Sequence, residues 1–163
     1  MAIIDDPSAY FQAKTYTGNG SGSHAITLDG NSNMQPDWVW IKKRNGAVNH
    51  LLHDSVRGVT KLLVSNTTGA DDVNTNILLG FDSNGFRVGS NSASNNNGDT
   101  FVSWNWKAGT SFTNDASATG IGSIDSTGSA SDTSGFSIVS YTGTGSAGTI
   151  KHGLNSAPNM IIQ

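Results

Sequence analysis

Hydrophobic and polar residues alternate along most of the first 107 positions, which is the pattern of half-buried β-strands. The alternating runs are 11–16, 24–28 and 100–107, and the runs 76–81 and 86–89 read as two strands on either side of a tight turn. The run 37–44 is apolar on both faces. Turn sequences rich in Gly, Asn and Asp separate these runs. Short strands with regularly placed turns predict an all-β fold for residues 1–107, an antiparallel sandwich or jelly roll of lectin-like type.

Three connections in this region have specific signals. Residues 11–28 are expected to form a hairpin around a glycine-rich turn, and Asn-Gly pairs at 45–46 and 84–85 predict turns that close strands. The segment 48–66 has leucines at helical spacing, but Gly58 and several β-branched residues disfavour a helix. We therefore expect short strands there, or at most a single helical turn.

Four tryptophans occur as two pairs, Trp38 with Trp40 and Trp104 with Trp106. Residues two apart lie on the same face of a strand, so each pair lines one face. An exposed pair would form a platform for stacking on sugar rings, and a buried pair would dominate the core. The core is favoured, because Val39 and Ile41 fill the opposite face of the first strand.

Residues 108–135 are rich in Ser, Thr, Gly and Asp, with isolated isoleucines. This composition predicts a linker or a weak hairpin between the first domain and the rest of the chain.

The last residues, 136–163, repeat the start of the chain and are expected to begin a second, related β module. Phe11 and Phe136 each precede a tyrosine by five residues, and each tyrosine opens the sequence Tyr-Thr-Gly-X-Gly-Ser. A histidine and a proline-led apolar run follow in both copies, at 36–40 and 158–162.

A pair of strands is at best marginally stable alone, so residues 136–163 need a pairing partner. Three sources are open: the edge of the first domain, another subunit, or a continuation of the natural chain. The candidate assembly residues of this segment are Phe136, Ile138, Val139, Tyr141, Met160, Ile161 and Ile162.

Several motifs resemble modules in structural proteins of marine tailed bacteriophages. They are DDPSAYF (5–11), YTGNG (16–20), QPDWVWIK (35–42), DSVRG (54–58), SNGF (83–86) and WNWKAG (104–109). Residues 135–143, 152–154 and 157–158 resemble a companion module that follows in the same proteins.

This resemblance spans nearly the whole chain and implies a virion component, such as a tail fibre, a head fibre or a capsid-surface protein. It implies a homo-oligomer, with a trimer as one option, that contacts other virion proteins. It names no catalytic residues, and it implies that such chains continue beyond residue 163.

Composition narrows the chemistry and the partners. The chain has no Cys and no Glu, and with 13% charged residues and a net charge of -3 it lacks the field that attracts nucleic acid. No apolar stretch has the length of a membrane span, and the N-terminus lacks the regions of a signal peptide. We expect no nucleic-acid or membrane partner, and synthesis in the host cytoplasm.

Residue types suited to catalysis occur without the required spacing. His53, Asp54 and Ser55 are the types of a hydrolase triad, but sequence neighbours cannot adopt its geometry. His50 and His53 share a face only on a helix, and no third zinc ligand is evident. The chain has no Glu, so a polysaccharide depolymerase would need two facing Asp residues. We assign no catalytic residue and no metal ligand.

Two loops carry the remaining candidates. A loop-bound Ca²⁺ at Asp71 and Asp72 with Asn74 is the one cofactor alternative, although exposed acids are the simpler account. The polar loop 90–99 would be the contact surface of a glycan- or receptor-binding module. Its candidate binding residues are Asn95, Asn96, Asn97 and Asp99.

Overall fold

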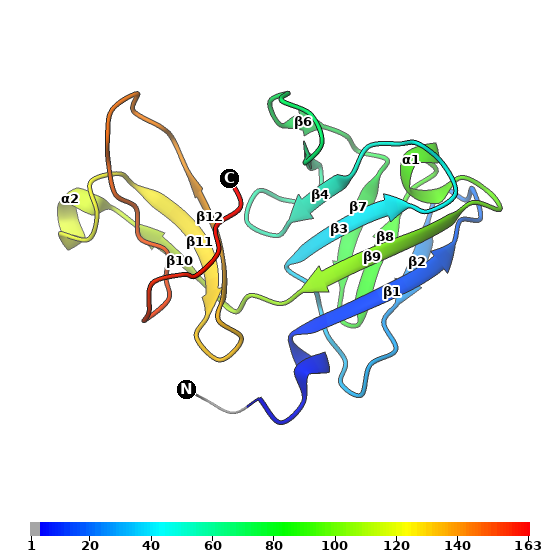
Figure 1. Cartoon of the computed structure of the whole chain (residues 1–163), viewed down its shortest axis with the longest axis horizontal. Coiled ribbons are helices and arrows are strands. Elements are labelled where there is room, and N and C mark those ends of the chain that lie inside the picture. Colours follow the sequence, from blue (N-terminus) through cyan, green and yellow to red (C-terminus); the bar gives the residue numbers. More distant parts are fainter. Residues whose placement is uncertain (1–3) are drawn as a thin grey trace. The chain divides into compact units, whose positions relative to one another are not determined.

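The computed structural model describes residues 4–163, and its chain divides into two compact units after Lys107. The first unit, Asp5–Lys107, contains η1 (Pro7–Ala9), β1 (Phe11–Thr17), β2 (His24–Thr27), β3 (Trp38–Lys43), β4 (Leu51–Asp54), β5 (Lys61–Val64), β6 (Asp72–Val73), β7 (Leu78–Asp82), β8 (Gly85–Val88), α1 (Ser92–Asn95) and β9 (Thr100–Trp106) (Figure 1).

These strands form two antiparallel sheets that pack as a sandwich. The larger sheet has the order β1-β9-β3-β4-β5-β6, and the smaller has the order β2-β8-β7. The all-β, antiparallel sandwich predicted for this region is therefore confirmed. The segment 48–66 forms β4 and β5, which are the short strands expected from its composition.

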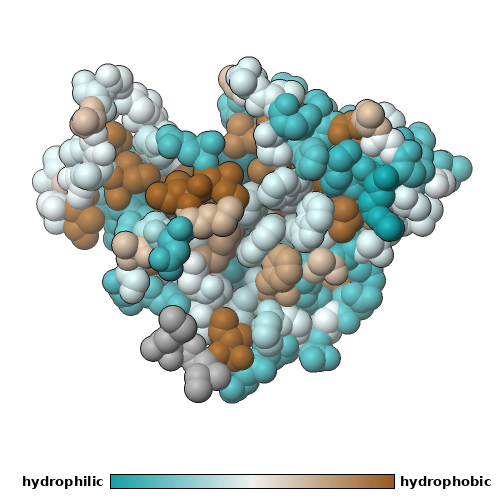
Figure 2. All heavy atoms as spheres, viewed as in Figure 1, coloured by the Kyte–Doolittle hydropathy of each residue, from teal (hydrophilic) through white to brown (hydrophobic). Residues whose placement is uncertain are grey.

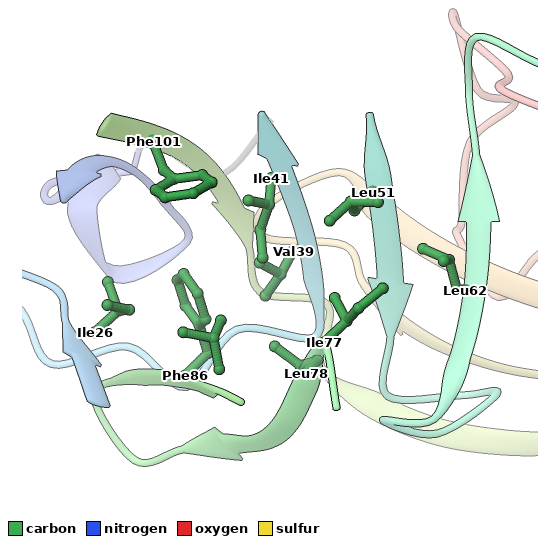
Figure 3. Close-up of a cluster of buried hydrophobic side chains, with 10 residues drawn as sticks. Ile26, Val39, Ile41, Leu51, Leu62, Ile77, Leu78, Phe86 and Phe101 are labelled. Carbon is green, nitrogen blue, oxygen red and sulfur yellow. The ribbon is translucent and has the colours of Figure 1, made fainter. Parts of the chain in front are cut away.

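The core lies between the two sheets (Figure 3). Val39, Ile41 and Phe101 contribute from the larger sheet, and Phe86 and Val88 from the smaller, and each is 0% exposed. On β3 and on β8 the two core residues are two positions apart, so the period of two sends one face of each strand inward.

The hairpin expected for residues 11–28 is wrong, because β1 pairs with β9 and β2 pairs with β8. The glycine-rich segment between β1 and β2 crosses from one sheet to the other. Its backbone bonds to a distant loop, with Gly18 N donating to Asp99 O and Gly20 N donating to Asn95 O, both at 2.8 Å. A Cβ on Gly18 would lie 2.2 Å from Asn96 O, so glycine is needed for this approach.

The tight connection between β7 and β8 is confirmed. Asp82 pairs with Gly85 across a turn made by Ser83 and Asn84. Gly85 has a φ of 127° and its hypothetical Cβ would lie 2.1 Å from Ile26 O, so no larger residue fits there.

The second unit is formed by Ala108–Gln163 and contains β10 (Thr110–Asn114), α2 (Ala116–Thr119), β11 (Ser126–Ser131) and β12 (Phe136–Tyr141). Its sheet has the order β10-β11-β12. None of the helices in the part of the chain that the structure describes is long and apolar enough to cross a membrane.

Of the two alternatives for residues 108–135, a linker or a weak hairpin, the hairpin is the one that forms, because β10 pairs antiparallel with β11. The unit packs by bringing backbone against an aromatic ring: Cβ atoms on Gly128 and Gly153 would each lie 2.6 Å from ring atoms of Phe112. Lys151 Nζ lies 5.3 Å from the centre of the same ring. Gly128 of the predicted linker or hairpin and Gly153 thus make room for the Phe112 ring.

The source of pairing for residues 136–163 also differs from all three expected sources. β12 pairs antiparallel with β11, so its partner comes from residues 126–131 of the same chain. None of the three expected sources includes the hairpin of residues 108–135, although that hairpin is one of the two alternatives predicted for the region.

Candidate functional site

The four tryptophans lie on the face of the larger sheet that is opposite to the core. Val39 and Ile41 are 0% exposed, whereas Trp38 and Trp40 between them on β3 are half-buried and point the other way. The same holds on β9, where Phe101 is in the core and Trp104 is half-buried. The preference for the tryptophans as core residues was therefore wrong.

A continuous row of rings crosses β1, β9 and β3 on this side. We call it the aromatic face, and it consists of Phe11, Trp38, Trp40, Trp104 and Trp106. The strand register places Phe11 and Trp38 on either side of Trp106, and Trp40 beside Trp104. Ring centres are 4.9 Å apart for Phe11–Trp106, 4.7 Å for Trp38–Trp106, 6.0 Å for Trp38–Trp40 and 5.9 Å for Trp40–Trp104.

His50 extends the aromatic face towards β4. Trp40 Nε1 donates to His50 Nδ1 at 3.1 Å, and the two ring centres are 5.9 Å apart. An indole nitrogen can only donate, so a neutral His50 carries its proton on Nε2. The bond holds the Trp40 ring in place and leaves the His50 Nε2–H as a donor at the margin of the aromatic face.

The other neighbours on β4 differ in character. Leu52, opposite Trp40, is apolar and 6% exposed. Asp54, opposite Trp38, accepts from Arg57 Nε at 2.6 Å and from Arg57 N at 2.8 Å. Because its carboxylate is bound by Arg57 through two bonds, the face ends in an ion pair and not in an isolated charge.

Phe11 and His50 were not assigned to a site by sequence. Phe11 is 40% exposed and stands at the first position of β1. Its contact with Trp106 depends on the pairing of β1 with β9, which are about 90 residues apart in the chain. Alternation predicted each strand, but no local signal could place the strands side by side.

In the predicted binding loop 90–99, Asn95 is buried and supports the fold. This residue is 0% exposed and its amide is fully used. Oδ1 accepts from Asn19 N and His24 Nδ1, each at 2.9 Å, and Nδ2 donates to Asn19 Oδ1, Ser21 O and Gly89 O. Asn95 thus joins the segment after β1 to the segment after β8.

The other loop residues form a polar cluster at the surface. Asp99 accepts from Lys43 Nζ and Asn96 Nδ2, each at 2.6 Å, and from Asn45 Nδ2 at 3.1 Å. These bonds, that of Lys43 first, lower the pKa of Asp99. Asn97 is exposed beside Gly20. Asn96 and Asn97 stay open to a partner, whereas Asn95 is closed to one.

Replacing Asn95 with alanine is expected to lower the free energy of unfolding by about 2 kcal/mol, because buried donors and acceptors lose their partner. Asn97→Ala, on the exposed neighbour, is the matched control and should change it by less than about 0.5 kcal/mol. Urea unfolding followed by tryptophan fluorescence measures both. Equal stability of the two variants would contradict the assigned role of Asn95.

The hydrolase-like residues do not come together. Ser55 Oγ donates to Asp37 Oδ1 at 2.8 Å, and His53 Nδ1 bonds to Val59 O at 3.1 Å. His53 lies on the core side of β4, and Asp54 lies on the aromatic side. A serine nucleophile therefore has no histidine base here.

The expected metal candidates are also dispersed. His50 is bonded to Trp40 and His53 is in the core. Asp71 forms an ion pair with Lys61 at 3.2 Å, and Asp72 Oδ1 accepts from Val73 N. Across residues 4–163, no three His, Asp or similar ligands are grouped closely enough to hold a metal ion.

Hollows outside the aromatic face include the following two. One, of about 520 Å³, lies in the first unit over the core residues Leu51, Leu62 and Ile77. The other, of about 280 Å³, lies in the second unit and includes Asp115 and Asp125. Those two carboxylates already accept from Ala118 N and Ala116 N at the start of α2.

Comparison with known proteins gives one family. A family model described as a domain of unknown function, DUF7483, matches residues 6–163. No curated protein and no solved structure matches the chain.

Proposed function

The chain belongs to the DUF7483 family, and we propose that it is a structural module of a bacteriophage virion that binds host-surface saccharide through its aromatic face. In this proposal the module acts by assembly and binding, without catalysis. It assembles as a homo-oligomer among other virion proteins. The phage origin rests on the motif resemblance, and the binding role rests on the aromatic face.

The arrangement of the rings is the observation that carries the binding role. Trp40, Trp104 and Phe11 lie on one side of a rigid sheet, supported from behind by the core. The weakly polarised C–H groups of a pyranose ring pack well against aromatic π faces, and rings held by a sheet lose little entropy on binding. A row of rings across three strands suits an extended chain of sugars.

The margin of the aromatic face supports a polar ligand over an apolar one. His50 offers an Nε2–H donor next to Trp40, whereas Asp54 beyond Trp38 is buried and bound by Arg57. Saccharides need both stacking and hydrogen bonds to their hydroxyl groups, and ligand sites combine the two in this way.

The test is binding of bacterial surface polysaccharide to the purified chain and to Trp40→Ala and Trp104→Ala. Each variant should bind about tenfold more weakly, equivalent to ~1.4 kcal/mol. Trp40→Phe keeps a ring and should recover most of the affinity. Thermal unfolding of each variant shows whether the fold is kept.

Asn97→Ala separates the aromatic face from the loop 90–99. Unchanged affinity in this variant together with the losses at Trp40 and Trp104 supports the proposal. Weakened binding by Asn97→Ala, with unchanged binding by the two tryptophan variants, would place the binding site in the loop 90–99. The length of the polysaccharide after incubation is measured in the same samples, and shortened chains would show a depolymerase.

A further inference from the structure

Four Asn-Gly pairs occur in the chain, and the fold holds them differently. Their asparagines are Asn19, Asn45, Asn84 and Asn97. An asparagine followed by glycine is prone to intramolecular deamidation, because no side chain hinders attack by the glycine nitrogen on the asparagine amide. The attacking group is the backbone nitrogen of the glycine, so the hydrogen bonds of that nitrogen decide which pair is free to react.

In three of the pairs the glycine N–H donates to a backbone oxygen. The three donors are Gly20, Gly85 and Gly98, with N···O distances of 2.8, 3.1 and 2.9 Å. The same three glycines have positive φ, at 67°, 127° and 79°. In these pairs the hydrogen bond must open before the nitrogen can attack the asparagine.

Gly46 is the exception. Among the residues that the structure describes, its N–H donates to no oxygen. Asn45 and Gly46 are both exposed, but exposure does not single them out, since Asn97 and Gly98 are exposed as well. Figure 2 shows hydrophilic residues gathered over this end of the first unit, where β3 ends and β9 begins in Figure 1. The free N–H therefore distinguishes Asn45 from Asn97.

The groups around Asn45 favour the attack. Its Oδ1 accepts from Thr100 N at 3.1 Å. Negative charge develops on Oδ1 when a nucleophile adds to Cγ, so the Thr100 N–H is placed to stabilise that charge. A Cβ on Gly46 would lie 3.1 Å from Lys43 Nζ, so an ammonium group lies beside the attacking nitrogen. A neighbouring positive charge favours loss of the proton from that nitrogen.

We propose that Asn45 deamidates by attack of Gly46 N, and that the product loosens the contact between residues 44–50 and the loop 90–99. The Gly46 nitrogen gives its proton to hydroxide and forms a bond to Asn45 Cγ. The Cγ–Nδ2 bond breaks, and the amide nitrogen takes a proton from water and leaves as ammonia. One water molecule then opens the five-membered imide at either carbonyl, which gives aspartate or isoaspartate.

The product changes the charge of this contact. Asn45 Nδ2 donates to Asp99 Oδ1 at 3.1 Å, and the reaction replaces this donor with a carboxylate oxygen. The chain then has one more negative charge than its net charge of -3. Two carboxylates at this distance repel each other, so residues 44–50 separate from the loop more readily. Neither step involves the aromatic face, so the saccharide role and this modification can hold or fail separately.

Peptide mass spectrometry of the folded chain, incubated in mildly alkaline buffer, follows the reaction. Aspartate and isoaspartate should accumulate at position 45 about tenfold faster than at Asn97, because the bond of Gly98 N must first open. Asn97 is the matched internal control, and Asn19 and Asn84 should also react slowly. In denaturing urea the rates at all four positions should become similar, because every glycine N–H is then free.

Gly46→Ala provides the variant test. Gly46 is not one of the glycines with positive φ, and the added Cβ would meet only the flexible end of the Lys43 side chain, so the fold is kept. The methyl group hinders the attacking nitrogen, and deamidation of Asn45 should slow severalfold. Ala47→Gly, at the next exposed position, is the control and should leave the rate unchanged.

Asn45→Asp supplies the aspartate product directly. Arg44 N donates to Thr100 O at 2.7 Å, and hydrogen exchange of this amide reports on the contact. Exchange should be about fivefold faster in the variant, and the difference should shrink at high salt, which screens the repulsion. Asn97→Asp adds the same charge at an exposed position and should leave exchange at Arg44 unchanged.

Three results would overturn the proposed site: equal rates at Asn45 and Asn97 in the folded chain, a preference for Asn45 that persists in urea, or an unchanged rate in Gly46→Ala. Unchanged exchange at Arg44 in Asn45→Asp would overturn the proposed effect on the loop 90–99.

Discussion

Replacing Phe101 with alanine is expected to lower the free energy of unfolding of the first unit by about 4 kcal/mol. The ring is 0% exposed and stacks on Tyr16 with ring centres 5.1 Å apart. It stands on β9, which pairs on both sides and cannot move to fill the cavity. The loss is therefore the transfer free energy of the ring plus the energy of the cavity.

Val102→Ala is the matched control, since Val102 is the next residue on β9 but is half-buried on the aromatic face. Its loss should be about 1 kcal/mol, because a smaller group leaves a partly solvated site. Urea unfolding followed by tryptophan fluorescence reports on the first unit, which contains all four tryptophans. A larger loss for Val102→Ala than for Phe101→Ala would mean that β9 presents its other face to the core.

The strands of the first unit were predictable because each depends on local alternation. Which face of β9 is turned towards the core was not predictable. Its tryptophans alternate with Ser103 and Asn105, so polarity alone sends the tryptophans inward. The structure instead buries Ser103 and Asn105, and Asn105 Nδ2 donates to Gln12 O and Ser103 Oγ, each at 3.0 Å. A buried amide that is hydrogen-bonded across strands resembles a surface residue in sequence.

Strand partners and loop contacts were the other part that sequence did not reveal. The turn after β1 looks like a hairpin turn, yet Asn95 bonds to Asn19 and Ser21 within it and holds it to the loop after β8. About 75 residues separate these groups along the chain, so no local pattern links them. For the same reason the sequence predicted Asn95 as a binding residue, whereas it is buried and connects two loops.

The second unit was the hardest to predict, because its packing depends on glycines, which leave room for an aromatic ring. Phe112 lies against Gly128 and Gly153, and β11 consists only of Ser, Thr, Gly and Ala. Sequence periodicity detects apolar side chains that recur at regular spacing. Here two glycines make room for a single ring, and they give no such pattern. The sequence predicted an exposed aromatic surface only as the less favoured alternative. It identified the four tryptophans of the aromatic face but favoured their burial.

Acidification is expected to lower the stability of the first unit between pH 6.5 and pH 4 through His53. This histidine is 0% exposed, and burial is the largest cause that lowers its pKa from 6.5 to about 4. Between these two pH values the unfolded chain binds a proton that the folded chain does not. The unfolding free energy therefore falls as the pH decreases through this window, by about 3 kcal/mol in total.

His53→Gln removes the titrating group, so its unfolding free energy should change less across this window even if it is less stable throughout. Urea unfolding at half-unit pH steps measures the slope, and the difference between chain and variant cancels the contribution of the aspartates. Below pH 4 the folded His53 takes up the proton as well, so its effect on stability ends there. A difference that continued to grow below pH 4 would assign the acid sensitivity to another group.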